Sequence, residues 1–523
     1  MQADQNSHNS ADKRYRRRIL SWALYDWANH AYITTTATTY FPPYFLVIAA
    51  PMFLKAGAGP ADNASLARDA ASNVFAFTIA LALCCAAILA PIVGTYADLT
   101  DKRKRILVRI TVFGGILASS MFWLTTGMWL QALALYFLTQ VIVNIALGLN
   151  SSLLPHTALP HDMNRVSSLG YAMGYIGGGL LLAGNTAVFF FAARLGISSD
   201  LAVRLAFLSV GVWWIGFTIP YALNVPEPKI LSRVRNKSGS PLRDSFLQIA
   251  STIRDIRRYS ELFKMLIAFS FYMEGIGAII LLATVYGAAL GLPLAVLIGT
   301  LLMTQIVAFP YAILFGRIPD ARNKWRGAYL SMVLWTAFTL PVLGWYVKTA
   351  GDISIPRTFF ILAVDQIAGI IFSFALGRFL FAGLADKIDT KRAVILGLTI
   401  YIIVPLWGYF LTTKAEFFML GWLVGTVQGG TQALSRTIYA KLSPPAKSGE
   451  FFGLYGLSEK FAGILGPFLY GMVGQVTHSP KSSILSIVVF FFIGIWLLQR
   501  IDIEKGARVA TEEEREVESG LAP

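Results

Sequence analysis

The sequence predicts an all-α integral membrane protein with fourteen spanning helices, and three observations point to that fold class. Hydrophobic residues make up 55% of the 523 residues and charged residues only 14%, a balance outside the range of ordinary soluble domains. Stretches of about 20 apolar residues, the length that crosses a bilayer as a helix, recur along the whole chain. An even number of spans also keeps the strongest basic runs on one side of the membrane, as the positive-inside rule expects.

The predicted spans follow one another with one long polar interruption, after the sixth. A count of twelve is the alternative, with 327–347 not counted as a true span. The first span holds a carboxylate, a run of threonines and the pair Pro42 and Pro43; we expect the threonine hydroxyls to bond to their own backbone and the prolines to break the helix. The ranges are 20–50, 73–97, 106–126, 130–154, 166–194, 201–225, 262–290, 293–315, 327–347, 358–385, 393–413, 417–440, 451–475 and 482–499.

Charge and targeting signals suit a bacterial inner membrane, with the membrane of a eukaryotic organelle as the alternative. The net charge of +15 is interpreted as membrane topology and attraction to an anionic inner leaflet, not as binding of nucleic acid. The first nineteen residues are polar and basic, so we expect no cleavable signal peptide and both termini in the cytoplasm. Cys84 and Cys85 are adjacent within a span, which predicts no disulfide framework.

The polar segments divide the chain into five parts. We expect a tail at 1–19, a six-helix bundle at 20–225, a basic linker at 226–261, a second bundle with an inserted hairpin at 262–499 and a tail at 500–523. In the linker, Phe246, Ile249, Ile253 and Ile256 share one face, which predicts an amphipathic helix on the inner leaflet. The final tail is rich in glutamate with almost nothing apolar to bury, so we expect it to be disordered.

Two segments of the chain look like repeats of each other. "GTYADLTDKRKR" (94–105) and "GLADKIDTKR" (383–392) each close a span with a glycine, an acid and a basic run, and such duplication is typical of secondary transporters built from two related bundles. The glycine lets helices approach, and the cations can clamp the neighbouring bundle while one face is closed; a simple topogenic charge cluster is the alternative. The predicted gating residues are Gly94, Asp98, Lys102, Arg103, Lys104, Gly383, Asp386, Lys391 and Arg392.

The first of these stretches resembles the signature loop between the second and third helices of the major facilitator superfamily, with Asp101 where that pattern has glycine. "WALYDWANHAYITTT", "SSLGYAMGYIGGGLLL", "QGGTQALSRTIYA" and "FFGLYGLSEKFAGILGP" resemble the vacuolar-effluxer-like branch of that superfamily over nearly the whole chain. The resemblance implies a major facilitator fold of two pseudo-symmetric six-helix bundles and transport of small solutes, with amino-acid efflux as the activity of fungal members.

Fourteen spans are two more than that core needs. "FGRIPDARNKWRG" (315–327) and "GLADKIDTKR" both resemble the loop expected after the second helix of the second bundle, and the distance between Asp320 and Asp386 has room for one helical hairpin. We therefore expect a hairpin inserted between them, either outside the core or replacing part of it.

Polar residues within the spans are the candidates for a substrate or proton site. An ionisable group at membrane depth costs about 2.5–3.5 kcal/mol, so Asp26 is expected to bind substrate amine or proton, to hydrogen-bond between helices, or to lie near the inner interface. Glu274 lies deeper and is the favoured protonatable site. Arg436 is either a further candidate or an anchor at the inner end of its span. The full set is Tyr25, Asp26, Asn29, Tyr272, Glu274, Gln305, Asp365, Arg378, Gln428 and Gln432.

These features predict a secondary active transporter. A small polar organic solute, such as an amino acid, would move by alternating access with a proton or other coupling ion; carboxylates would bind its amine, and Arg378 or helix N-termini its carboxylate. A transport-inactive scaffold or receptor is the alternative. We expect no enzyme and no cofactor, since phosphate-loop and hydrolase motifs do not occur. We also expect no metal site, since His156, His161 and Asp162 make a sparse ligand set.

Overall fold

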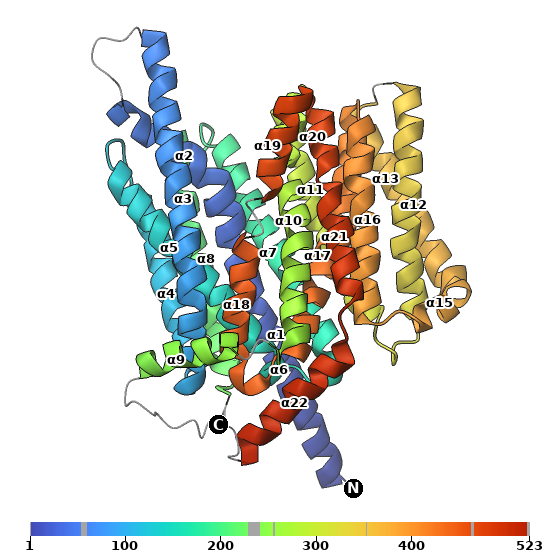
Figure 1. The fold of residues 1–523 in the computed structure, drawn as a ribbon. Helices are drawn as coiled ribbons and strands as arrows, with labels where there is room; N and C mark the ends of the chain where they lie inside the picture. The colour runs from blue at the N-terminus through green and yellow to red at the C-terminus, as the bar shows by residue number, and fades with distance from the viewer. Residues whose placement is uncertain are drawn as a thin grey trace.

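The computed structural model describes residues 2–53, 60–228, 241–254, 257–351, 353–461 and 465–519. Within these ranges every regular element is helical, and most helices run side by side through one bundle (Figure 1). Among the described residues, eleven helices are long and apolar enough to cross a membrane. The remaining predicted spans 20–50 and 417–440 also fall on helical segments, and the described part of 451–475 falls on two helices that end at Phe461 and begin at Leu465; residues 462–464 lie outside the described residues. The all-α membrane fold is therefore confirmed, while the count of fourteen crossings stays a prediction.

The helices of the first half of the molecule pack on one another in pairs. α1 lies against α7 and α8, α3 lies against α5, and α4 lies against α8. Ser198 caps α8 by accepting a hydrogen bond from the backbone N–H of Leu201, as an N-cap serine does. The helices are α1 (Gln2–Ala31), α2 (Phe41–Ala49), α3 (Pro60–Leu99), α4 (Arg103–Ser120), α5 (Trp129–Ser152), α6 (Leu154–Thr157), α7 (Met163–Phe190) and α8 (Ser199–Asn224).

The first span is interrupted before its prolines and not by them. A π-helical segment, Tyr32–Tyr40, joins α1 to α2, and Pro42 and Pro43 stand in the first turn of α2. The helix restarts there because proline is tolerated in a first turn, where N–H groups lack helical partners. Three of the five threonines bond to the backbone as predicted: Thr34 donates to the carbonyl of His30 at 2.9 Å, and Thr38 and Thr39 donate to the carbonyl of Thr34 at 2.8 and 2.7 Å. The buried hydroxyls of Thr35 and Thr36 have no hydrogen-bond partner among the described residues. Such segments are frequent at functional sites.

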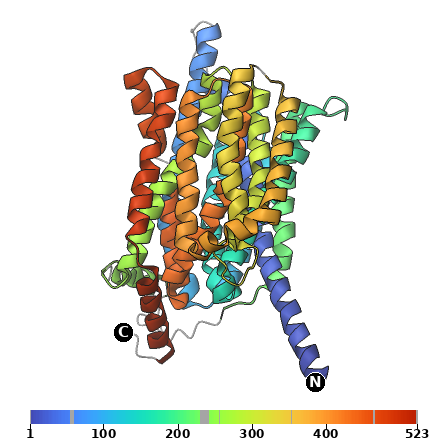
Figure 2. The same cartoon turned by 90° about the vertical axis from the view of Figure 1, so that its right-hand side faces the viewer.

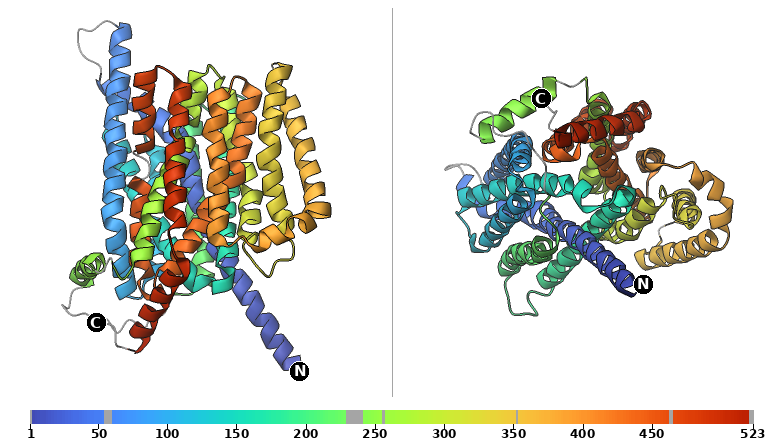
Figure 3. Two further views of the ribbon diagram at one scale, coloured as in Figure 1. Left: turned by 45° about the vertical axis from the view of Figure 1, so that its right-hand side comes forward. Right: turned by 90° about the horizontal axis from the view of Figure 1, so that it is seen from below.

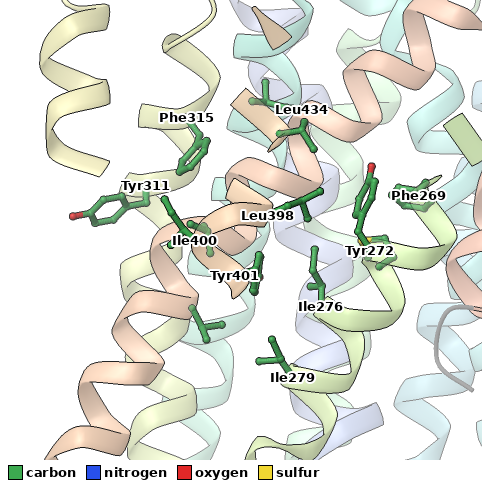
Figure 4. Close-up of a cluster of buried hydrophobic side chains, with 14 of the residues drawn as sticks. Phe269, Tyr272, Ile276, Ile279, Tyr311, Phe315, Leu398, Ile400, Tyr401 and Leu434 are labelled. Carbon is green, nitrogen blue, oxygen red and sulfur yellow. The ribbon is translucent and has the colours of Figure 1, made fainter. Parts of the chain in front are cut away.

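The second half repeats the plan of the first. α10 lies against α21, α11 against α17, and α16 against α17, α20 and α21. Part of its core is the cluster in Figure 4, where Tyr272 and Ile276 of α10, Phe315 of α11 and Leu398 of α16 gather. The helices are α10 (Ser260–Ala289), α11 (Leu294–Arg317), α12 (Arg326–Ala350), α13 (Ile355–Phe372), α14 (Arg378–Leu380), α15 (Ala382–Asp386), α16 (Thr390–Phe410), α17 (Lys414–Leu442), α18 (Ser448–Phe461), α19 (Leu465–Thr477), α20 (Pro480–Ser486) and α21 (Val488–Gln499).

The hairpin of α12 and α13 lies at the edge of the molecule (Figures 1 and 2). α12 packs on α17 and α11, whereas α16 makes the contacts in the second half that α4 makes in the first. We infer that α12 and α13 are the inserted pair and that they lie outside the core. A polar network ties them together, because Asp365 accepts hydrogen bonds from the indole of Trp335 at 3.2 Å and the hydroxyl of Thr339 at 3.1 Å.

One end of the bundle, which we call the basic end, carries the start of α1, the turn between α3 and α4, and the helices α9 (Pro241–Arg254) and α22 (Ile503–Ser519) (Figure 3). α9 is the helix predicted in the linker; Ile256 of its expected face lies outside the described residues. The prediction of a disordered tail is wrong through residue 519. α22 forms because its glutamates meet basic partners elsewhere, such as Lys447, and Ala510 is buried against the bundle.

Candidate functional site

A cavity of about 540 Å³ lies between the two halves, a size within the range of small-molecule sites. Its wall comes from α1, the π-helical segment, α5 and α7 on one side and from α10, α11, α17 and α18 on the other. The predicted residues Asp26, Gln305, Gln428 and Gln432 line it. The other polar side chains of the wall are His30, Thr34, Thr38, Thr39, Asn144, Ser151, Tyr171, Tyr175, Arg436 and Tyr455.

The charged pair in this wall joins the two halves. Asp26 of α1 accepts a hydrogen bond from the Nη1 of Arg436 of α17 at 3.3 Å, and both side chains are almost fully buried, at 2% and 4% exposure. Asn150 donates a further bond to Asp26 at 3.0 Å. Arg436 also donates to the hydroxyl of Ser167 at 2.9 Å and lies over the rings of Trp22 and Tyr171. Removing one partner of such a pair leaves a buried charge uncompensated, at about 3–5 kcal/mol.

Close packing of α1 on α7 holds this pair and its neighbour His30. A Cβ added at Gly170 would overlap the Oδ2 of Asp26, and one added at Gly174 would overlap the imidazole of His30. The Nδ1 of His30 lies 3.1 Å from the carbonyl oxygen of Asp26, and its ring lies edge-on to those of Tyr171 and Tyr175. Only glycine at these two positions lets the helices approach so closely. A larger residue would displace Asp26 or His30 from the cavity wall.

Further bonds cross from α7 to α17 and α16, in the cavity wall and beyond it. The hydroxyl of Tyr175 donates to the Oε1 of Gln432 at 2.6 Å, and the hydroxyl of Ser167 donates to the carbonyl of Ala433 at 2.7 Å. Asn164 donates to the hydroxyl of Thr390 at 3.0 Å. These bonds join the halves from the cavity toward the basic end.

Four predicted residues lie inside the bundles and are not part of the cavity wall. The hydroxyls of Tyr25 and Thr111 are 2.9 Å apart, and Tyr272 donates to Ser435 at 2.7 Å. Asn29 is fully buried, with no hydrogen-bond partner for its side chain among the described residues. Glu274 is 1% exposed and accepts a hydrogen bond from the backbone N–H of Gly466 in the first turn of α19, a position that favours a carboxylate.

Two other predicted residues lie in or beside the inserted hairpin. Asp365 belongs to the network of α12 and α13 described above. The guanidinium of Arg378 lies over the rings of Trp325 and Phe379, at 5.1 and 4.4 Å from their centroids. Neither residue lines the cavity.

At the basic end, the first half grips a segment of the second that we call the gate segment, Pro445 to Glu450. Asp98 accepts hydrogen bonds from the backbone N–H groups of Gly449 and Glu450 at 3.1 and 3.0 Å, which places a carboxylate at the N-terminus of α18. Arg103 is fully buried and pairs with Asp98 at 2.5 Å. It also donates to the hydroxyl of Ser448 at 2.6 Å and to the carbonyls of Pro445 and Ala446 at 3.2 and 3.0 Å.

Two residue positions of the signature follow from the structure of the α3 to α4 turn: the residue at 101 and the glycine at 94, which faces α18. Asp101 has φ 51°, the left-handed conformation that glycine adopts most readily and aspartate tolerates, so it can stand where the superfamily pattern has glycine. A Cβ at Gly94 would overlap the carbonyl of Gly449. Lys102 is exposed, and Lys104 bonds to the carbonyls of Ala222 and Val225 within the first half. Among the described residues, Arg103 is the cation of this motif that bonds across.

Histidine 156, on α6, completes this contact. Its Nε2 accepts a hydrogen bond from the Nη1 of Arg103 at 2.6 Å, because a guanidinium can only donate. Burial, with the positive charge of Arg103 beside the ring, lowers the pKa of His156 to about 3. The ring is therefore neutral at physiological pH.

A charged side chain of the second half, in the turn after α11, also binds the first half. Arg322 pairs with Asp162 of the first half at 3.1 Å, and the hydroxyl of Tyr15 donates to the same carboxylate at 2.9 Å. The predicted residues of 383–392 instead bond within the second half. Asp386 is 71% exposed and pairs with Arg326 at 3.6 Å, and Lys391 donates to the carbonyl of Ile501 at 2.9 Å. Arg392 bonds to the carbonyl of Lys387, and an added Cβ at Gly383 would meet open space.

Comparisons with known proteins agree with this architecture. The chain matches the family described as vacuole effluxer Atg22 like over residues 14–364 and 355–511. It is 29% identical over 504 residues to the uncharacterized MFS-type transporter YxiO of Bacillus subtilis (strain 168), over 96% of this chain and 98% of that protein. It is 24% identical over 354 residues to autophagy-related protein 22 of Cryptococcus neoformans var. neoformans serotype D (strain B-3501A), over 67% of this chain and 54% of that protein.

Among solved structures, the major facilitator superfamily proton:xylose symporter XylE, bound to 6-bromo-6-deoxy-D-glucose, has a TM-score of 0.59. The identity is 14%, and the match covers 98% of this chain and 100% of that one, a likeness that shows the fold. Together with the two pseudo-symmetric halves and the cavity between them, the family match shows that this multi-pass membrane protein is a transporter, not an enzyme. The chain belongs to the vacuole effluxer Atg22-like family of the major facilitator superfamily.

Proposed function

We propose that the protein moves a small polar organic solute across a bacterial inner membrane by alternating access, with its basic end in the cytoplasm and the solute bound beside Asp26 and Arg436. The observation that carries the proposal is the buried ion pair in the cavity wall, because it joins the two halves at the place where a solute would bind. The structure is then the state closed toward the cytoplasm. Basic loops at that end favour this orientation and contact with an anionic inner leaflet.

An amino acid is the solute that the wall suits best. Asp26 can accept bonds from an amine and Arg436 can donate to a carboxylate, so a zwitterion could exchange partners with both while the net charge of the cavity stays unchanged. A second pocket of about 80 Å³, bounded largely by apolar residues, shares Gln305 and Gln428 with the cavity. It has room for several non-hydrogen atoms of an apolar side chain.

A proton is the proposed coupling ion. Protonation of Asp26 would remove one charge of the pair and so weaken its contact with Arg436, which would keep its bonds to Ser167 of α7. The halves could then separate at this level, which links a change of charge to the change of access. Glu274 stays a second proposed proton site, and its place beside α19 would couple it to that helix and not to solute.

The test is flux of a labelled amino-acid mixture into proteoliposomes with and without a pH gradient. Asp26→Asn should lower gradient-driven flux at least about tenfold, and Arg436→Gln should do the same, since either change leaves one buried group uncompensated. Asp12→Asn, in an exposed pair with Arg16 on α1, is the matched control and should transport normally. Glu274→Gln separates the two proton sites.

Equal flux in Asp26→Asn and the control would remove the ion pair from the mechanism. If the wild-type protein moves no amino acid, a panel of sugars, organic acids and peptides follows. Failure of the whole panel would return the interpretation to a transport-inactive scaffold.

A further inference from the structure

The gate segment is held from two sides. Its inner side bonds to Asp98 and Arg103 of the first half, as described above. Its outer side bonds to α9 and α22, two helices that lie across the basic end and are not part of either bundle (Figure 3). These outer bonds serve no solute and belong to segments that composition alone assigns to linker and tail.

α22 holds the middle of the gate segment. Glu514 accepts a hydrogen bond from the backbone N–H of Ala446 at 2.8 Å, and Glu513 accepts one from the Nζ of Lys447 at 2.5 Å. Both backbone polar groups of Ala446 are thus bonded: its N–H to Glu514 of α22 and its carbonyl to Arg103 of the first half. The carboxylate of Glu513 is 3% exposed and also pairs with Arg258, just before α10, at 2.9 Å. Charge-assisted bonds of this kind are about twice as strong as neutral ones.

α9 holds the end of the gate segment and reaches the other half. The Nε2 of Gln248 donates to the Oε2 of Glu450 at 2.8 Å, and Glu450 is fully buried. α9 itself packs on α3, the helix that supplies Asp98. The contact of α9 therefore crosses between the halves, whereas the contacts of α22 stay within the second half and fix the shape of the segment that the first half binds.

We propose that α9 and α22 form a clasp that stabilises the state closed at the basic end, so that linker and tail set how readily the gate opens. The proposal rests on the alternating access proposed above. Separation of α18 from α3 breaks the bonds of Gln248, Asp98 and Arg103 together. Without α22, the carbonyls of Pro445 and Ala446 lose the support that presents them to Arg103, and the closed state loses stability although its bonds to the first half remain available.

The test measures opening directly and needs no solute. Cys84 and Cys85 are replaced by alanine, and Ser168→Cys is introduced as a probe; Ser168 is 1% exposed, on α7 against Gly316 of α11, so a maleimide reaches it when the halves part at the basic end. In nanodiscs, the double variant Glu513→Gln, Glu514→Gln should label about fivefold faster than the parent, as should Gln248→Ala, because each shifts a two-state equilibrium toward the open state.

Glu512→Gln is the matched control, on the same helix and exposed, and should label at the parent rate. Parent rates in the double variant and in Gln248→Ala would overturn the proposal, and so would an equal rise in Glu512→Gln. If the double variant does not fold, Lys447→Gln takes its place in the test, because it removes the gate-segment cation that pairs with Glu513. Because labelling is independent of flux, a failure here is distinguishable from a wrong solute or coupling ion.

Discussion

The α3 to α4 turn and the α15 to α16 turn carry the same signature, a glycine and an aspartate followed by basic residues, but they bond across the molecule differently. Among the described residues, the first turn bonds to the other half through its charged side chains, whereas the second does so through the hydroxyl of Thr390. Arg103 is fully buried and bonds to the gate segment, whereas Arg392 bonds to the carbonyl of Lys387 next to it. In the second half, the corresponding charged contact at the basic end comes from Arg322, which pairs with Asp162 of the first half. A motif specifies residue types at a helix end; what they bind depends on which helices the insertion leaves beside them.

The sharpest way to break this comparison is to remove the two arginines in turn. Arg103→Ala should raise labelling of the Ser168→Cys probe at least about thirtyfold, because it leaves Asp98 buried without its cation. Arg392→Ala should stay within about twofold of the parent, since exposed contacts contribute little. Equal effects of the two substitutions would show that both turns act as gates.

The two glycines give the next largest difference. Gly94→Ala should lower the free energy of unfolding by about 1–3 kcal/mol, because the added methyl group meets the backbone of α18. Gly383→Ala should change it by less than about 0.5 kcal/mol, since the methyl group enters open space. Thermal unfolding in detergent, followed by tryptophan fluorescence, measures both. A stable Gly94→Ala protein would mean that α3 and α18 can part without loss.

Acid should destabilise the contact of Arg103 and His156 with the gate segment. It should have no such effect on the contacts of the α15 to α16 turn. An exposed histidine titrates near about 6.5, whereas the pKa of His156 in the closed state is lowered to about 3. The open state therefore binds more protons, so the closed state is fully stable above about pH 6.5 and loses stability as the pH falls toward about 3. At pH 5.5 the labelling rate, taken as a ratio to His156→Gln at the same pH, should be about tenfold above its value at pH 8. A constant ratio would contradict the assignment.

The smallest effect should come from the crossing contact of the second half. Arg322 is 57% exposed, and half-exposed ion pairs contribute about 0.2–1 kcal/mol. Arg322→Ala should therefore raise the labelling rate only about twofold to threefold, and 0.5 M salt should reduce the difference between variant and parent. An effect as large as that of Arg103→Ala would show that the pair of Arg322 and Asp162 stabilises the closed state as much as Arg103 does.

Sequence reasoning found one member of each contact more easily than the other. Asp98 and Arg103 stand in a recognisable pattern, but the gate segment that they bind has no pattern of its own. Asp26 is conspicuous as an acid in an apolar stretch, while Arg436 resembles an anchor at the end of its span until the fold brings α17 against α7. Distance along the chain carries no sign of such pairing, so only the three-dimensional arrangement supplies it.

Depth left the partner of Glu274 open, and composition misled the prediction for the last segment. The position of Glu274 along α10 gives its depth, but not the direction of its side chain, which meets the start of α19 and not the cavity. The glutamates of the last segment read as a solvated tail because their partners, Arg258 and Lys447, lie far away in the chain. Helical periodicity and hydrophobic length, by contrast, predicted nearly all the membrane helices, because those follow from local sequence.

The position of α22 has a practical consequence for anyone who handles this protein. A fluorescent protein or affinity handle joined after Pro523 would follow a helix that contacts the gate segment through Glu513 and Glu514. Its bulk or charge would disturb these contacts, so the measured transport would differ from that of the untagged protein. The start of α1 projects from the basic end, away from the gate segment (Figure 1). Handles for purification and imaging belong on that end of the chain.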